Sequence, residues 1–174
     1  MLTKTSLSAV RALAFLAYQR REQPWSPRSI AQQLGESPTY LAKVVRHLVR
    51  AGILKAHRGV TGGVVLLQPP EAISLLAIVE ACQGRILGDF CSDADDLGKV
   101  CAFHRAGAEL HRAIVGVLSR WTLADLLAKP RPDPCLGADD ECWLAPCTRL
   151  LSLATPAKMV AAPRGTAGRG GKSR

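Results

Sequence analysis

The chain has 174 residues, 48% of them hydrophobic, and no apolar run reaches the about 18 residues of a membrane span, so we expect a mostly folded protein without a membrane partner. Its first residues lack the apolar core of a signal peptide, so we expect a cytoplasmic protein whose six cysteines serve as reduced thiols or metal ligands rather than disulfides. The net charge of +9 is concentrated in residues 1–60, where ten Lys and Arg accompany only Glu22 and Glu36. This distribution indicates a partner with a phosphate backbone, such as a nucleic acid. The alternative is a basic surface that only keeps the protein soluble.

Three helices are expected in this basic third of the chain. Apolar residues at helical spacing over 7–17 predict a first helix that ends near residues 20–21. Ser-Pro pairs at 26–27 and 37–38 each combine a capping serine with a proline suited to the first helical turn. The first of these pairs starts the second helix, which ends at the glycine at residue 35. The other pair starts the third helix, which ends at the glycine at residue 52.

A β-hairpin is expected next. Two apolar-rich runs, 53–58 and 64–67, flank the glycine-rich segment 59–63, and glycines permit the positive φ angles of a tight reversal. A fourth helix follows, capped by Ser74. This order predicts a mainly α chain with a small β-hairpin, a winged helix-turn-helix DNA-binding domain over residues 1–84.

The remainder of the chain divides into four segments. An acidic loop over 85–100 precedes a long helix and a short one within 101–128, and the long helix carries an apolar stripe from Val100 to Val117. We expect a Pro- and Cys-rich extension over 129–154 and a disordered basic tail over 155–174.

The third helix has two unlike faces. Apolar residues between Leu41 and Leu48 fall on one face, which seats the helix on its domain. The opposite face combines hydroxyls and cations without an acid, whereas a solvated face usually mixes charges. We therefore expect the partner to be a double-stranded DNA operator, read by the N-terminal end of this helix.

Candidate DNA contacts follow from position along the chain. The candidates to read or approach base edges are Ser37, Thr39, Tyr40 and Lys43. The candidates for phosphate contacts are Arg28, Arg46 and Arg50, and Arg58 at the hairpin tip is placed to enter the minor groove or hold phosphate. The alternatives are that Tyr40 is a half-buried packing residue and that Arg58 is an exposed solubilising charge.

A family resemblance extends these interpretations over residues 1–128. The blocks that carry it, in order, are 1–3, 9–17, 30–31, 40–45, 48–54, 58–63, 73–75, 78–81, 101–104 and 122–126. With them the chain resembles the Rrf-two family of bacterial winged-helix transcriptional regulators (IscR/NsrR/RirA-like). The resemblance implies a DNA-binding regulator, most often a repressor, and a homodimer that pairs through the long helix of 101–128. The alternative, a helix packed only on its own domain, would leave much of the apolar stripe uncovered.

The resemblance also implies a sensor in the acidic loop. Many members sense iron–sulfur, nitric oxide or redox status through a cluster bound by three loop cysteines and, in some, a histidine. Cys91 and Cys101 match the first and third cysteines and His104 the histidine, although His104 is equally interpreted as an ordinary surface residue. The second cysteine is missing, and Leu7 occupies the position of the acidic ligand that other members use. Cys82 is expected to be a buried core thiol.

This incomplete ligand set leaves three alternatives open. In the first, an iron–sulfur cluster on Cys91 and Cys101 is completed by a cysteine of the extension, Cys135, Cys142 or Cys147. In the second, the regulator binds no cluster and senses through thiols. In the third, the extension binds zinc, for which only Cys142 and Cys147 have knuckle spacing.

An enzyme is not expected. The chain lacks a Gly-rich phosphate loop, and Cys101 with His104 has no orienting third group. A metal-handling or protein-interaction module on a winged-helix scaffold is the remaining alternative. For the regulator, we predict that gain or loss of a cluster changes the angle between the two recognition helices and thereby the operator affinity.

Overall fold

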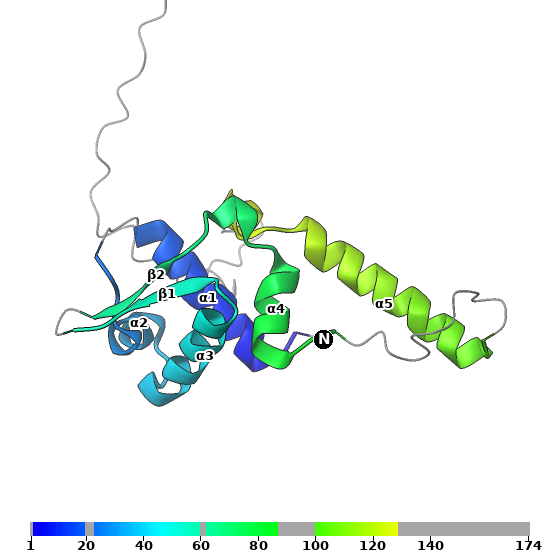
Figure 1. Cartoon of the computed structure of the whole chain (residues 1–174), viewed down its shortest axis with the longest axis horizontal. Coiled ribbons are helices and arrows are strands. Elements are labelled where there is room, and N and C mark those ends of the chain that lie inside the picture. The colour runs from blue at the N-terminus through cyan, green and yellow to red at the C-terminus, as the bar shows by residue number, and fades with distance from the viewer. Residues whose placement is uncertain (1, 20–22, 60–61, 87–99, 129–174) are drawn as a thin grey trace, which may run out of the picture.

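Six α-helices and one two-stranded hairpin make up the part of the chain that the computed structural model describes, residues 2–19, 23–59, 62–86 and 100–128 (Figure 1). In chain order they are α1 (Lys4–Gln19), α2 (Pro27–Leu34), α3 (Pro38–Arg50), β1 (Leu54–His57), β2 (Gly63–Leu66), the 3-10 turn η1 (Pro70–Ala72), α4 (Leu75–Gln83), α5 (Ala102–Arg120) and α6 (Leu123–Ala128). Cys91, most of the predicted sensor loop and everything after residue 128 lie outside the described residues. No helix within these described ranges has the length and apolar character needed to cross a membrane.

The helices begin at the serines that the sequence indicated. Ser26 Oγ accepts a hydrogen bond from the backbone N–H of Ser29 at 3.0 Å, and Ser74 Oγ accepts one from that of Ala77 at 3.1 Å. Ser37 precedes α3 in an extended conformation, but its side chain makes no capping hydrogen bond. The exposed hydroxyl of Ser37 is therefore available at the start of α3.

A single core joins α1 to the other elements of the winged domain. Helix α1 packs against α2, α3, α4, α6 and β2, and Leu13 and Phe15 are among its fully buried side chains. The short last helix follows the long one directly in the chain, but it packs on the winged domain. In the structure, Leu123 of α6 is fully buried in the winged-domain core, and the Tyr18 hydroxyl donates to the carbonyl of Leu127 at 3.3 Å. Residues 123–128 thus belong to the winged domain.

The start of α6 is closed by a reciprocal capping pair. The backbone N–H of Thr122 donates to Asp125 Oδ2 at 2.8 Å, and the backbone N–H of Asp125 donates to Thr122 Oγ1 at 3.2 Å. The backbone hydrogen bond from Thr122, followed by the one from its hydroxyl, lowers the pKa of the Asp125 carboxyl.

The hairpin is held to the helices by a third segment. Trp25 and Val64 exchange two backbone hydrogen bonds, of 3.1 and 2.8 Å, alongside the antiparallel pair of β1 and β2. Gly59 has a φ of 117°, as expected for a glycine in a reversal. Gly63 is needed for another reason, because a Cβ built there would lie 2.5 Å from both the carbonyl carbon and oxygen of Trp25.

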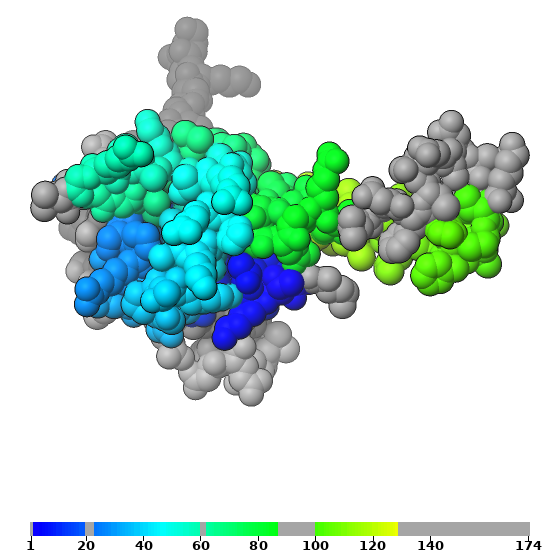
Figure 2. Space-filling model, turned by 60° about the horizontal axis from the view of Figure 1, so that its bottom comes forward, coloured from blue at the N-terminus to red at the C-terminus, as the bar shows by residue number. Residues whose placement is uncertain are grey.

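Helix α5 projects from this domain as an arm (Figures 1 and 2). Its C-terminal end is attached to the start of α4 by an antiparallel bridge between Ser74 and Thr122. In that bridge the N–H of Leu75 donates to the Trp121 carbonyl, and the N–H of Leu123 donates to the Ile73 carbonyl, both at 2.8 Å. The N-terminal end of α5 is the end remote from the winged domain (Figure 1).

Candidate nucleic-acid interface

Helix α3 is buried on one side and open on the other, as its sequence predicted. Its apolar side chains, Leu41, Val44, Val45 and Leu48, are buried in the core. The exposed candidates on the other side are Ser37, Thr39, Lys43, Arg46 and Arg50. The same packing that anchors the helix therefore presents its polar side to solvent.

The charge of this exposed side is positive and unneutralised within the described residues. Neither Lys43, Arg46 nor Arg50 forms an ion pair with an acid in that part of the chain. Arg28, in the first turn of α2, is exposed as well. Exposed cations that form no ion pairs with nearby acids are suited to contacts with phosphate oxygens.

A groove lies between α3 and the hairpin. It has a volume of about 520 Å³, and Arg46 and Val49 of α3 line it together with His57, Arg58 and Gly62 of the hairpin. The structure thus brings Arg46 and the hairpin-tip Arg58 to one surface, as the winged-helix interpretation requires. Arg28 does not line this groove. His57 also lines this groove although no sequence motif singled it out; the signal for it was its place directly before Arg58.

Tyr40 differs from the other candidates because it is only partly exposed. It packs on the core, and its hydroxyl donates to Thr5 Oγ1 of α1 at 3.4 Å. The ammonium of Lys4 lies 5.7 Å from the centre of its ring. Tyr40 is thus a link between α1 and α3, and Lys4 is an exposed cation beside the recognition helix that the sequence analysis did not identify.

A second cluster lies at the remote end of α5. Cys101 occupies the N-cap position of this helix, and its Sγ lies 2.9 Å from His104 Nδ1. Thiolate and imidazole are both ligands for iron and zinc, so these two side chains fit part of a metal-binding set. No group of three or more His, Cys, Asp or Glu side chains that could hold a metal occurs among residues 2–19, 23–59, 62–86 and 100–128, and the third candidate ligand, Cys91, lies outside those ranges.

Cys82 of α4 packs on the core as predicted, although its side chain is half-buried and not fully buried. Burial raises the pKa of its thiol to about 11, so the group stays protonated near neutral pH and is a poor nucleophile.

Comparison with known proteins shows that the chain is similar to bacterial transcriptional regulators. The family described as "Rrf2: Iron-dependent Transcriptional regulator" matches residues 2–129. The chain is 38% identical over 130 residues to slr0846 of Synechocystis, named as an HTH-type transcriptional regulator, across 72% of this chain and 86% of that protein. It is 30% identical over 142 residues to the HTH-type transcriptional repressor NsrR of Streptomyces coelicolor, across 80% of this chain and 96% of the repressor.

Solved structures give the same result. CymR, the global cysteine regulator of B. subtilis, superposes with a TM-score of 0.59 at 30% identity, across 74% of this chain and 96% of CymR. IscR of T. potens superposes with a TM-score of 0.57 at 28% identity, across 74% of this chain and 86% of IscR.

Proposed function

Since this chain belongs to the Rrf2 family of transcriptional regulators, we propose that it is a homodimeric repressor that recognises a specific operator in double-stranded DNA. The observation that carries this proposal is the cationic, acid-free side of α3, exposed while its apolar side is buried in the core. Repression is the mode named for the Streptomyces coelicolor relative. The alternative of a metal-handling or interaction module gives no reason for the exposed side of α3 to carry cations and no acid.

The proposed contacts divide into those that read bases and those that bind the backbone. The base-reading group is Ser37, Thr39 and Lys43, with Tyr40 at its edge. The backbone group is Arg28, Arg46 and Arg50, and Arg58 enters the minor groove or binds phosphate at its rim. The division follows from distance along α3, because the N-terminal part of a recognition helix approaches base edges most closely.

Lys43→Ala and Arg50→Ala are expected to separate these two groups. Lys43→Ala should lower the preference for the best operator over single-base variants by about 10-fold, because a base contact carries sequence information. Arg50→Ala should weaken all duplexes alike and reduce the slope of log affinity against log salt by about 1, because it removes one phosphate contact. Fluorescence anisotropy with an operator selected from a random duplex pool measures both quantities.

Arg120→Ala is the matched control for these variants. Arg120 is exposed at the end of α5, so its loss removes one positive charge away from α3. A sequence-selective loss in Arg50→Ala, or an unchanged preference in Lys43→Ala, would contradict the assigned roles.

Dimerisation is proposed to occur through α5. Phe103, Leu110 and Val117 repeat at seven-residue intervals along it and are 72%, 63% and 45% exposed. A neighbouring groove of about 510 Å³, lined mainly by apolar side chains, includes Val79 of α4 and Ile114 of α5. An exposed apolar stripe beside an apolar groove supports pairing with a second copy, which would cover both.

The sensor is proposed to lie at the remote end of this dimer helix. Cys101 and His104, together with Cys91, would hold an iron–sulfur cluster, with the remaining ligand supplied from elsewhere in the dimer. Such a cluster supplies an iron- and redox-dependent bond between the loop and α5. The description of the family as iron-dependent supports this assignment. The 2.9 Å approach of Cys101 Sγ to His104 Nδ1 also favours the second candidate, a cluster-free thiol sensor.

Cys101→Ala is expected to abolish cluster binding. Wild-type protein purified without oxygen should show visible absorbance and contain iron and sulfide, and the variant should lose all three because it lacks a primary ligand. Cys82→Ala, which removes a core thiol, should retain them. Colourless, iron-free wild-type protein would end the cluster proposal; operator affinity that then falls with peroxide and recovers with dithiothreitol would support the thiol sensor.

A further inference from the structure

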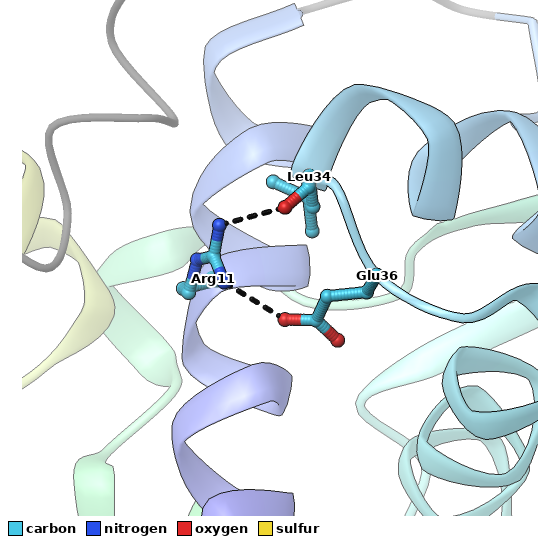
Figure 3. Close-up of polar contacts among 3 residues, drawn as sticks. All are labelled: Arg11, Leu34 and Glu36. Atoms are coloured by element: carbon cyan, nitrogen blue, oxygen red, sulfur yellow. Dashed lines mark hydrogen bonds and ion pairs between the residues drawn. The ribbon is translucent and has the colours of Figure 1, made fainter.

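Arg11 of α1 connects that helix to the turn between α2 and α3 (Figure 3). Its Nη1 lies 3.0 Å from Glu36 Oε1, and its Nη2 donates to the carbonyl of Leu34 at 2.9 Å. The Arg11 and Glu36 side chains are only 15% and 11% exposed, so water screens their interaction far less than that of a surface pair. One guanidinium therefore holds two points of the turn at once.

These two points lie on either side of the residue that reverses the chain. Leu34 is the last residue of α2, Gly35 adopts the left-handed conformation with φ 66°, and Glu36 immediately precedes the N-cap residue of α3, Ser37. The Leu34 carbonyl is one of the helix-terminal groups that need a partner outside their own helix. The rigid, planar fork of arginine fixes the end of α2 and the entry to α3 relative to each other, which a lysine ammonium cannot do.

The helix that carries Arg11 is itself fixed. Residues 12–15 of α1 are buried in the core, so the backbone next to Arg11 has little freedom to shift. A second attachment joins α1 to the first turn of α3, through the Tyr40 hydroxyl and Thr5 Oγ1. The N-terminal end of α3 is thus held to α1 at the turn before it and at its first turn.

Glu36 also needs Arg11 for an electrostatic reason. It is the only acid that the structure describes between residues 2 and 59, and it stands next to Ser37 on the proposed DNA-reading end. Its second carboxylate oxygen, Oε2, has no hydrogen-bond partner among the described residues. Arg11 compensates a carboxylate that would otherwise be costly to bury and would repel phosphate.

We propose that Arg11 is a positioning residue for operator specificity. This role rests on the proposed DNA-binding function. Arg11 acts through Leu34 and Glu36 to hold Ser37 and Thr39 at the angle that base reading requires. Phosphate contacts made by long, flexible side chains tolerate a small tilt of α3, whereas base contacts do not. The proposal therefore concerns selectivity between sequences, and not only stability of the fold.

The test compares Arg11→Lys with Glu36→Gln. Each protein is titrated, at 25 °C and several salt concentrations, with an operator duplex selected by wild-type protein and with a scrambled duplex of equal length; thermal unfolding is measured in parallel. Arg11→Lys keeps the charge but loses the fork, so it should retain scrambled-duplex affinity and salt slope while its operator preference falls about 10-fold. Glu36→Gln keeps an acceptor for Arg11 and should retain the wild-type preference.

The outcomes are distinct. A wild-type preference in Arg11→Lys, with only its unfolding temperature lowered, would overturn the proposal and leave a structural ion pair. Equal losses of affinity for both duplexes would overturn it, because they would show a general weakening of DNA binding without a change in operator preference. If Arg11→Lys does not fold, Glu36→Ala, which keeps the Leu34 contact, should still lower the operator preference, and an unchanged preference would overturn the proposal. Wild-type protein that selects no operator would refute the proposed function itself, and this inference with it.

Discussion

Leu110→Glu is expected to produce a monomeric protein with operator affinity reduced at least about 100-fold. Leu110 lies at the middle of the exposed α5 stripe, so a carboxylate there would be desolvated at the centre of the proposed dimer interface. The monomer fold should survive, because the side chain is 63% exposed within the subunit. The affinity loss follows because a dimer binds two half-sites and a monomer only one. Light scattering and anisotropy titration measure the two effects.

Ser119→Glu is the control for this variant. Ser119 is nine residues further along α5 and exposed, so at about 100° per residue it lies on the side opposite Leu110. The Ser119→Glu variant should remain dimeric and bind the operator with wild-type affinity. If the Leu110 variant stays dimeric, or if its monomers bind the operator as tightly as wild type, α5 is not the element through which the protein pairs.

Gly63→Ala is expected to destabilise the winged domain by about 1–3 kcal/mol, enough to lower the midpoint of thermal unfolding by several degrees. The added Cβ would lie 2.5 Å from the Trp25 carbonyl carbon and oxygen, and this part of the backbone is fixed by its pairing with Val64. Either the hairpin or the Trp25 segment must move. A shifted hairpin displaces Arg58, so operator affinity should fall too.

Gly116→Ala provides the contrast. A Cβ at Gly116 meets nothing within 4 Å, and alanine favours a helix interior more than glycine does, so this change should leave the stability equal or raise it by up to about 1 kcal/mol. Thermal and urea unfolding of the two variants give the comparison. An equal loss in both would show that the close approach at Gly63 carries no strain.

Elements determined by neighbouring residues were predictable from the sequence. The Ser-Pro pairs, the apolar spacing of α3 and the glycines of the hairpin are local signals, and the structure has helices and strands where they indicated. The exposed side of α3 was predictable for the same reason, since burial of one side of a helix determines the other.

Contacts between distant residues were not predictable. No signal near Arg11 indicates its partner, because Glu36 lies 25 residues away in the sequence. The return of α6 to the core depends on packing between residues 109 positions apart, Tyr18 and Leu127. The role of Gly63 depends on a third segment beside the hairpin, which no hairpin signal contains. Lys4 lies beside the candidate interface because the first turn of α1 packs against Tyr40.

The backbone bridge between Ser74 and Thr122 couples the orientation of α5 to that of the winged domain. Because the bridge fastens the C-terminal end of the arm to the winged domain, the two rotate together. With 19 residues, α5 is about 28 Å long, so a rotation of about 10° about its far end carries the domain about 5 Å, more than the roughly 3.4 Å between successive base pairs. A rotation of that size at the N-terminal end of α5 would therefore shift the winged domain out of register with the periodicity of the double helix.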